Sequence, residues 1–198
     1  MNYLAHIYLS EDLPQITIGN FIADGIRGKS YLKFPKTIQT GVLLHRFIDS
    51  YTDSHPIVRK STKRLHPKYH HYSGVIVDIY YDHFLAKNWT KYTTEPLSQY
   101  AETFYQLLQD NYHILPERTQ QLLPYMIKGN WLVSYASLEG IESVLIGMNK
   151  RTKYQSNMNE AIQELVAYYN EFETEFTAFF EDLQQATHKQ LIALDSKT

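Results

Sequence analysis

A long run of apolar residues near the end of the chain repeats with alternating steps of four and three residues. That spacing places all of them along one narrow face of a helix. The repeated positions are Met158, Ile162, Leu165, Tyr169, Phe172, Phe176, Phe179 and Leu183. Acidic side chains are expected on the outer face, at Glu171, Glu173, Glu175 and Glu181. The pattern predicts one long C-terminal amphipathic helix, whose aromatic-rich seam packs into a core or against a second copy of the chain.

Helical periodicity also dominates the rest of the chain, and no run of strand length alternates with a period of two. Proline, glycine and capping residues predict helices over residues 14–27, 36–51, 54–66, 73–89, 97–112, 117–128 and 137–149. Pro67 is expected to follow the end of the third, which Asp53 or Ser54 would cap, and Pro124 to kink or split the sixth. A length of 198 residues suits a single domain. We therefore expect residues 1–198 to form one all-α multi-helix bundle.

The composition excludes several classes of site. Without cysteine, the chain has no disulfide, no thiolate zinc site and no cysteine nucleophile. It contains no Walker loop, glycine-rich dinucleotide turn or G-x-S-x-G motif, which argues against a nucleotide cradle and a serine hydrolase. The first residues lack the features of a signal peptide, and no apolar stretch approaches the ~18 residues of a membrane span. We expect a soluble cytoplasmic protein.

Two pairs of polar residues at i,i+4 spacing interrupt apolar, helix-like segments: His45 with Asp49, and Asp78 with Asp82. Residues four apart lie on the same face of a helix. Two carboxylates placed in this way repel each other, and burying them among apolar neighbours costs several kcal/mol unless a cation neutralises them. The spacing therefore predicts a divalent metal ion held between two helices.

Other polar residues in the first third of the chain extend this candidate site. His6 and Asp24 add a histidine and a carboxylate to the set of ligands. Such ligands without sulfur suit Mn²⁺, Mg²⁺, Fe²⁺ or Zn²⁺. The metal would lower the pKa of a bound water, and Arg46, next to His45, would hold a phosphoryl oxygen. In the competing interpretation, His6 is a hydrogen-bonded core residue and Asp24 or Asp53 is a capping residue.

Charge is distributed unevenly along a chain whose net charge is only −2. Residues 27–68 hold ten Lys and Arg against two Asp, whereas residues 69–198 carry an excess of acids. Within the basic part, five cations and no acid lie in residues 59–68: Arg59, Lys60, Lys63, Arg64 and Lys68. A basic segment beside a candidate metal site indicates an anionic substrate or partner, and a solvated basic face is the alternative.

Several phrases of the chain resemble those of one known family. They are N-Y-L-A-H-I at 2–7, G-N-F-I-A-D-G-I-R-G at 19–28, G-V-L-L-H-R-F-I-D-S-Y-T-D-S-H-P at 41–56, D-I-Y-Y-D-H-F-L-A-K-N-W at 78–89 and G-M at 147–148. In this order they are similar to phrases of the acyl carrier protein phosphodiesterases. The resemblance implies a helical bundle like that of the HD metal phosphohydrolases, of which this family is considered a divergent relative. The chain departs from the HD pattern because it contains Asp82-His83, the reverse of the His-Asp order.

The resemblance implies a specific reaction. It is the Mn²⁺-dependent hydrolysis of the phosphodiester that joins 4′-phosphopantetheine to a serine of holo-acyl carrier protein, giving apo-acyl carrier protein and 4′-phosphopantetheine. Taken together with the spacing, it makes six residues the expected metal ligands: His6, Asp24, His45, Asp49, Asp78 and Asp82. The expected catalytic residues are Asp82, His83 and Arg46.

The resemblance also implies a partner. Acyl carrier proteins are small and strongly acidic, so the five cations of residues 59–68 are expected to bind one. We expect no nucleic-acid partner and no membrane insertion, and a homodimer through the last helix stays open.

Two other functions are compatible with the sequence. A phosphohydrolase of a small nucleotide or phosphoester would keep the metal site and would not need the basic segment. A non-catalytic helical module would use the polar residues as a buried network and the long aromatic helix to bind a partner. Metal content separates this module from the two enzymes, and charge reversal at Lys60, Lys63 and Arg64 separates the two enzymes from each other.

Overall fold

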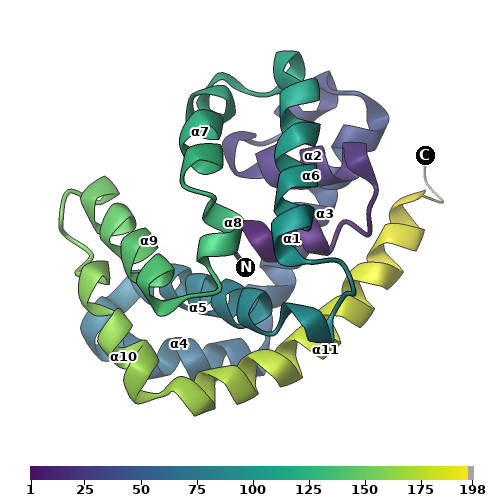
Figure 1. The fold of residues 1–198 in the computed structure, drawn as a ribbon. Helices are drawn as coiled ribbons and strands as arrows, with labels where there is room; N and C mark the ends of the chain where they lie inside the picture. Colours follow the sequence, from purple (N-terminus) through teal and green to yellow (C-terminus); the bar gives the residue numbers. More distant parts are fainter. Residues whose placement is uncertain (196–198) are drawn as a thin grey trace.

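The computed structural model describes residues 1–195, which form helices and turns without a β-strand (Figure 1). The first half contains α1 (Tyr3–Tyr8), α2 (Pro14–Ile22), η1 (Ala23–Gly25), η2 (Ser30–Lys33), α3 (Lys36–Ser54), α4 (Pro56–Tyr69), η3 (His70–Tyr72) and α5 (Ser73–Lys87), where η marks a 3₁₀ helix. The second half contains η4 (Trp89–Lys91), α6 (Leu97–Asp110), η5 (Tyr112–Ile114), α7 (Glu117–Lys128), α8 (Trp131–Ser134), α9 (Leu138–Arg151), η6 (Met158–Glu160), α10 (Ile162–Ala167) and α11 (Tyr169–Asp195). The predicted all-α class is confirmed.

The helix α5 is apolar on nearly every side and lies at the centre of the core. Its buried residues include Ile76, Val77, Ile79, Tyr80, Tyr81, Phe84 and Leu85. The helices α1, α4, α9 and α11 pack against it. A helix that is hydrophobic all round must be enclosed by others, so its sequence alone requires this central position.

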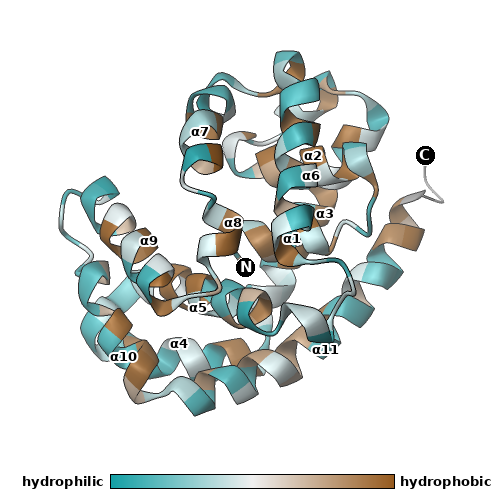
Figure 2. Cartoon of the chain, in the orientation of Figure 1, coloured by the Kyte–Doolittle hydropathy of each residue, from teal (hydrophilic) through white to brown (hydrophobic). Residues whose placement is uncertain are grey.

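The long helix α11 packs against α3, α4 and α5 and curves around the outside of the molecule in Figure 1. Apolar and polar residues alternate along it in Figure 2, as expected for an amphipathic helix. Phe172, Phe176 and Phe179 are fully buried, so the aromatic seam belongs to the core of this chain. Glu175 is the exception to the predicted acidic outer face, because it is buried against α4. No helix of the described part has the length and apolar character needed to cross a membrane.

The predicted C-terminal helix is divided in two. α10 ends at Ala167 and α11 begins at Tyr169, because Tyr168 leaves the helical region with φ −119° and ψ 33°. The apolar repeat continues across this break, so the sequence pattern did not predict the break. The change of direction lets α10 pack against α9 while α11 follows α3, α4 and α5.

Several predicted helix ends are also wrong. α4 continues through Pro67 to Tyr69, and α7 is not split at Pro124. A proline in a helix removes one backbone hydrogen bond, a loss that tertiary packing of the helix can outweigh. The N-cap of α4 is His55, whose Nδ1 accepts a hydrogen bond from the backbone N–H of Ile57. Asp53 and Ser54, the residues expected to cap α4, belong instead to the end of α3. The helix predicted over residues 14–27 ends at Ile22.

The crossing of α2 and α3 is unusually close, and it positions the candidate site. Gly19 of α2 faces Gly41 of α3. A Cβ atom on Gly41 would overlap the carbonyl oxygen of Ile16, and one on Gly19 would overlap the carbonyl oxygen of Ile38. Glycine at both positions therefore allows the two backbones to touch.

A candidate metal centre between the N-terminal helices

Three predicted ligands from two helices meet in one cluster. His6 of α1 and His45 and Asp49 of α3 bring their ligand atoms within 4.8 Å of one another. The distance from His6 Nε2 to Asp49 Oδ1 is 3.2 Å, and that from His45 Nε2 to Asp49 Oδ2 is 3.0 Å. The two imidazole rings are stacked with their centroids 4.1 Å apart, so both direct Nε2 toward the same carboxylate.

Asp24 joins this cluster from η1, the 3₁₀ turn after α2. Its Oδ1 lies 3.2 Å from Nε2 of His45. The two histidine side chains are buried, with exposed fractions of 4% and 8%, whereas the side chains of Asp49 and Asp24 are 43% and 65% exposed. The cluster therefore has a buried nitrogen side and an open carboxylate side.

Asn20 fixes the orientation of His6. The amide oxygen of this fully buried residue lies 2.8 Å from His6 Nδ1, and its Nδ2 donates to the His6 carbonyl and to Ser10 Oγ. Because the amide oxygen only accepts, Nδ1 carries the proton in the neutral ring, which leaves the Nε2 lone pair directed into the cluster. His6 Nε2 is buried without a hydrogen-bond partner, as expected for a nitrogen that is available to a metal. Asn20 was not predicted from the sequence, although G-N-F-I-A-D places it four residues before Asp24.

The carboxylates of the cluster favour the protonated form of His45. Burial opposes a charge on His45, but hydrogen bonds with Asp24 and Asp49 raise its pKa to about 9. Burial and the neighbouring His45 charge lower the pKa of His6, and the hydrogen bond with His45 lowers the pKa of Asp24. Burial opposes ionisation of Asp49, but its contacts with both histidines lower its pKa. Two imidazole nitrogens and two carboxylates that already neutralise a cation form a donor set that fits a divalent metal ion.

Asp78 and Asp82, the other two predicted ligands, are not part of the cluster of His6, His45 and Asp49, and both have partners within the chain. Asp78 Oδ1 lies 2.9 Å from the ammonium group of Met1. Asp82 is fully buried and accepts hydrogen bonds from the backbone N–H groups of Asn2, Leu4 and Ala5. The start of α1, with its positive helix dipole, therefore offsets part of the cost of burying Asp82. Burial raises the pKa of Asp82 to about 7, and the ammonium and these amides limit the rise.

His83 and Arg46, two of the expected catalytic residues, also lie away from the cluster. His83 is a buried core residue whose Nδ1 and Nε2 each lie 2.7 Å from an oxygen, the Tyr135 carbonyl and the Tyr169 hydroxyl. Arg46 donates to the carbonyls of Ile26 and Gly28, and it orders the segment after η1. Adjacent residues of a helix point about 100° apart, so neither side chain shares the direction of its neighbouring aspartate or histidine.

A cleft of about 940 Å³ opens beside the carboxylate side of the cluster. Asp24, Asp49, Asp53 and Asp78 line it together with residues of α5, α8 and α9. Asp53 therefore faces the cleft, and it does not cap α4. Arg118 of α7 and Arg151 of α9 also line the cleft. Neither arginine was predicted from the sequence, since both lie far from the ligand phrases and belong to no motif.

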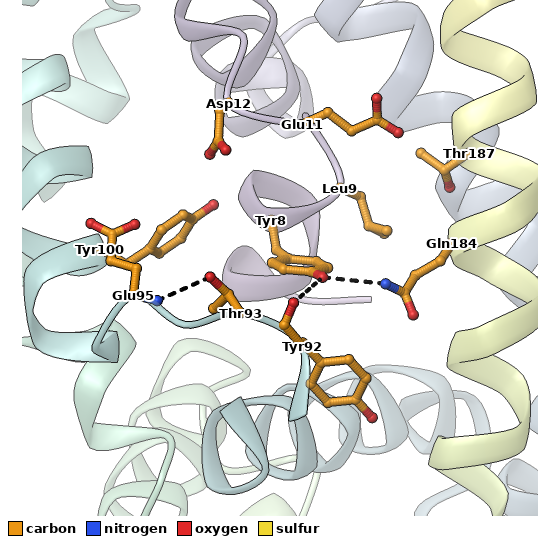
Figure 3. Close-up of a pocket in the computed structure, with 10 residues that line it drawn as sticks. All are labelled: Tyr8, Leu9, Glu11, Asp12, Tyr92, Thr93, Glu95, Tyr100, Gln184 and Thr187. Atoms are coloured by element: carbon orange, nitrogen blue, oxygen red, sulfur yellow. Dashed lines mark hydrogen bonds between the residues drawn. The ribbon is translucent and has the colours of Figure 1, made fainter. Parts of the chain in front are cut away.

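A second, smaller cavity of about 350 Å³ lies beside the end of α1 (Figure 3). Tyr8 donates a hydrogen bond to the Tyr92 carbonyl and accepts one from Gln184. Glu11, Asp12 and Glu95 line this cavity without a histidine. It contains none of the grouped ligand atoms that mark the cluster of His6, His45 and Asp49.

The basic segment of residues 59–68 is largely neutralised within the chain. The guanidinium of Arg64 binds both carboxylate oxygens of Glu175, and Lys60 lies 3.2 Å from the same side chain. Lys68 pairs with Glu160 and Glu164 of the C-terminal part. Arg59 and Lys63 have no carboxylate partner within residues 1–195. Among the five cations of the predicted docking segment, these two are therefore the ones without a carboxylate partner in the described residues.

The comparisons with family models and with known relatives lead to one family. A family model described as "Acyl carrier protein phosphodiesterase" matches residues 1–183. Relatives with the same name include proteins of Photorhabdus laumondii (30% identical, covering 91% of this chain and 91% of the relative) and of Yersinia pestis (32% identical, covering 96% and 100%). A third, from Escherichia coli O139:H28, is 31% identical over 96% of this chain and 100% of its own length. No solved structure matches, so the likeness to the HD fold stays a prediction.

Proposed function

Because the chain belongs to the acyl carrier protein phosphodiesterase family, we propose that it hydrolyses the phosphodiester of holo-acyl carrier protein. The oxygen of a water bonds to phosphorus, the bond from phosphorus to the serine oxygen breaks, and that oxygen takes a proton. The products are apo-acyl carrier protein and 4′-phosphopantetheine. The observation that carries the proposal is the cluster of two buried histidines and two carboxylates at the edge of a large cleft.

We propose that a divalent metal ion is held by His6, Asp24, His45 and Asp49. Mn²⁺ suits this mixture of nitrogen and oxygen ligands, with Mg²⁺, Fe²⁺ or Zn²⁺ as alternatives. When bound, such an ion lowers the pKa of a coordinated water and polarises a phosphoryl oxygen.

The residues of the chain prepare this site. Asn20 keeps His6 in one tautomer. His45, whose protonated form Asp24 and Asp49 favour, would have to lose that proton to become a metal ligand. Asp24 and Asp49 provide negative charge on the side that faces the cleft. The buried histidine side excludes water from the back of the cluster.

The direct test is to incubate the purified protein with holo-acyl carrier protein and Mn²⁺ and to measure the mass of the carrier protein. We expect loss of the phosphopantetheine arm, and a decrease in turnover of several orders of magnitude in His45→Ala. The matched control is His113→Ala, an exposed histidine remote in sequence from every ligand. A carrier protein that keeps its arm in the presence of the unmodified protein would favour the non-catalytic interpretation.

We also propose that Arg59 and Lys63 attract the acidic carrier protein, since they are exposed and lack an internal carboxylate partner. Arg59→Glu with Lys63→Glu should lower kcat/KM for holo-acyl carrier protein at low salt. The kcat/KM of the unmodified protein should also fall as salt rises, because the Debye length shortens to about 8 Å near 0.15 M ionic strength. Cleavage of bis(p-nitrophenyl) phosphate, a small diester, is the control and should scarcely change. If the double variant and the unmodified protein cleaved the carrier protein at equal rates, a small phosphoester would be favoured as the substrate.

A further inference from the structure

Two arginines face the same cleft as the candidate metal ligands. Arg118 is the second residue of α7 and Arg151 is the last residue of α9. Both side chains are exposed and line the cleft that Asp24 and Asp49 also line. Within the described part of the chain, neither guanidinium is paired with a carboxylate, in contrast to Arg64, which is bound by Glu175. Arg151 donates one hydrogen bond within the chain, to Met148 Sδ. A cleft with two guanidiniums that lack a carboxylate partner is suited to an anion.

Tyr3 lies in the same cleft as the two arginines and the candidate ligand Asp24. Burial, followed by the charge of Asp24, raises the pKa of its phenol, while the charges of Arg151 and Arg118 reduce that rise. All four residues line the same cleft, so the phenol, the two guanidiniums and the Asp24 carboxylate share one solvent space.

One face of α9 continues from Arg151 as a stripe of small and apolar residues. Gly140, Val144, Gly147 and Met148 occupy this face at helical spacing and line the cleft. A Cβ atom on Gly147 would meet nothing within 4 Å, so the glycine leaves open space beside the wall. Val75 of α5, an exposed apolar residue, lines the cleft as well. A cleft with an anion-binding end and an uncharged wall matches a phosphate ester with a long uncharged arm.

We propose that Arg118 and Arg151 bind the phosphoryl oxygens of the substrate and that the α9 stripe receives the pantetheine arm. This inference rests on the proposed function for the identity of the arm. Arginine binds phosphoryl oxygens through two parallel N–H groups. A metal ion held by the histidines and aspartates would not provide these hydrogen bonds. The two residues would orient the phosphorus beside the carboxylates of the cluster.

Calorimetric titration of the Mn²⁺-loaded protein with 4′-phosphopantetheine and with pantetheine tests the arginines. Arg118→Ala and Arg151→Ala should each weaken binding of 4′-phosphopantetheine by about tenfold or more, and leave that of pantetheine unchanged. Arg151→Lys should recover part of the loss, because a point charge replaces the fork of N–H groups. Arg27→Ala is the matched control, since Arg27 is exposed and does not line the cleft.

The wall is tested by adding volume at one glycine. Gly147→Leu should weaken the binding of both ligands, and Gly147→Ala should do so less. Equal affinity of the unmodified protein for the two ligands, or arginine variants that bind 4′-phosphopantetheine normally, would overturn the inference. If the unmodified protein leaves holo-acyl carrier protein intact but the arginine variants no longer bind 4′-phosphopantetheine, the proposed function fails and the arginine site stands.

Discussion

The side chain of His6 shows how one residue combines two roles that the sequence presents as alternatives. Its Nδ1 is hydrogen-bonded to Asn20 inside the core, as expected for a structural histidine. Its Nε2 is free of hydrogen bonds and points at Asp49, as expected for a ligand. The spacing of N-Y-L-A-H-I cannot distinguish these roles, because both place the ring on a buried helix face.

Asp82 should make the stability of the protein depend on pH in a defined direction. Its pKa is raised from 3.8 to about 7 in the folded protein by burial. Between about pH 4 and pH 7 the unfolded chain ionises this group while the folded protein keeps the proton, so its contribution to stability falls as pH rises and is constant above that range. The whole change amounts to at most about 4 kcal/mol.

The measurement is urea unfolding of the unmodified protein and of Asp82→Asn at several pH values. Because asparagine cannot ionise, the free energy of unfolding of the unmodified protein should fall relative to that of the variant between pH 4 and 7. A difference that does not vary with pH would show that the start of α1 compensates the charge of Asp82 completely.

At the scale of the elements, the crossing of α2 and α3 determines whether the cluster can form. α3 carries His45 and Asp49, while α2 carries Asn20 and leads into Asp24. The contact of Gly19 and Gly41 sets the distance between these two sets of side chains.

Gly41→Ala should therefore separate the helices. We expect a loss of about 2 kcal/mol or more in the free energy of unfolding, since the new Cβ overlaps the Ile16 carbonyl. Mn²⁺ affinity should fall with it, because His45 and Asp49 shift relative to Asn20. Thermal unfolding and Mn²⁺ titration check both effects. Gly147→Ala adds the same methyl group in open space, and an equal loss of stability in that variant would contradict the explanation.

Arg64 should act on the stability of the fold, since it joins α4 to α11. Its guanidinium binds Glu175, whose side chain is only 6% exposed. Arg64→Ala leaves that carboxylate buried with Ser61 and Lys60 as its remaining partners, and should cost about 3 kcal/mol. Lys63→Ala on the same helix removes an unpaired cation and should change stability by less than about 0.5 kcal/mol. Chemical denaturation compares the two variants, and equal effects would argue against the buried pair.

At the scale of the whole molecule, the sequence predicted the helices better than the contacts between them. The periodicity of residues 158–183 identified the aromatic seam, and His6, Asp24, His45 and Asp49 do come together. Asp78 and Asp82 did not join them, because the start of the chain folds onto α5 and no local pattern reports such a distant contact. Arg118 and Arg151 could not be identified, since only the fold brings them to the cleft.

The central claim is that the metal lies among His6, Asp24, His45 and Asp49, and calorimetric titration of the protein with Mn²⁺ tests it most directly. The unmodified protein should bind the ion, and Asp49→Asn should lose most of its affinity because it removes a charge from the cluster. Asp78→Asn, which alters a carboxylate of the same cleft that is bound to the Met1 ammonium, should bind as the unmodified protein does. Normal binding by Asp49→Asn, together with lost binding by Asp78→Asn, would contradict the account.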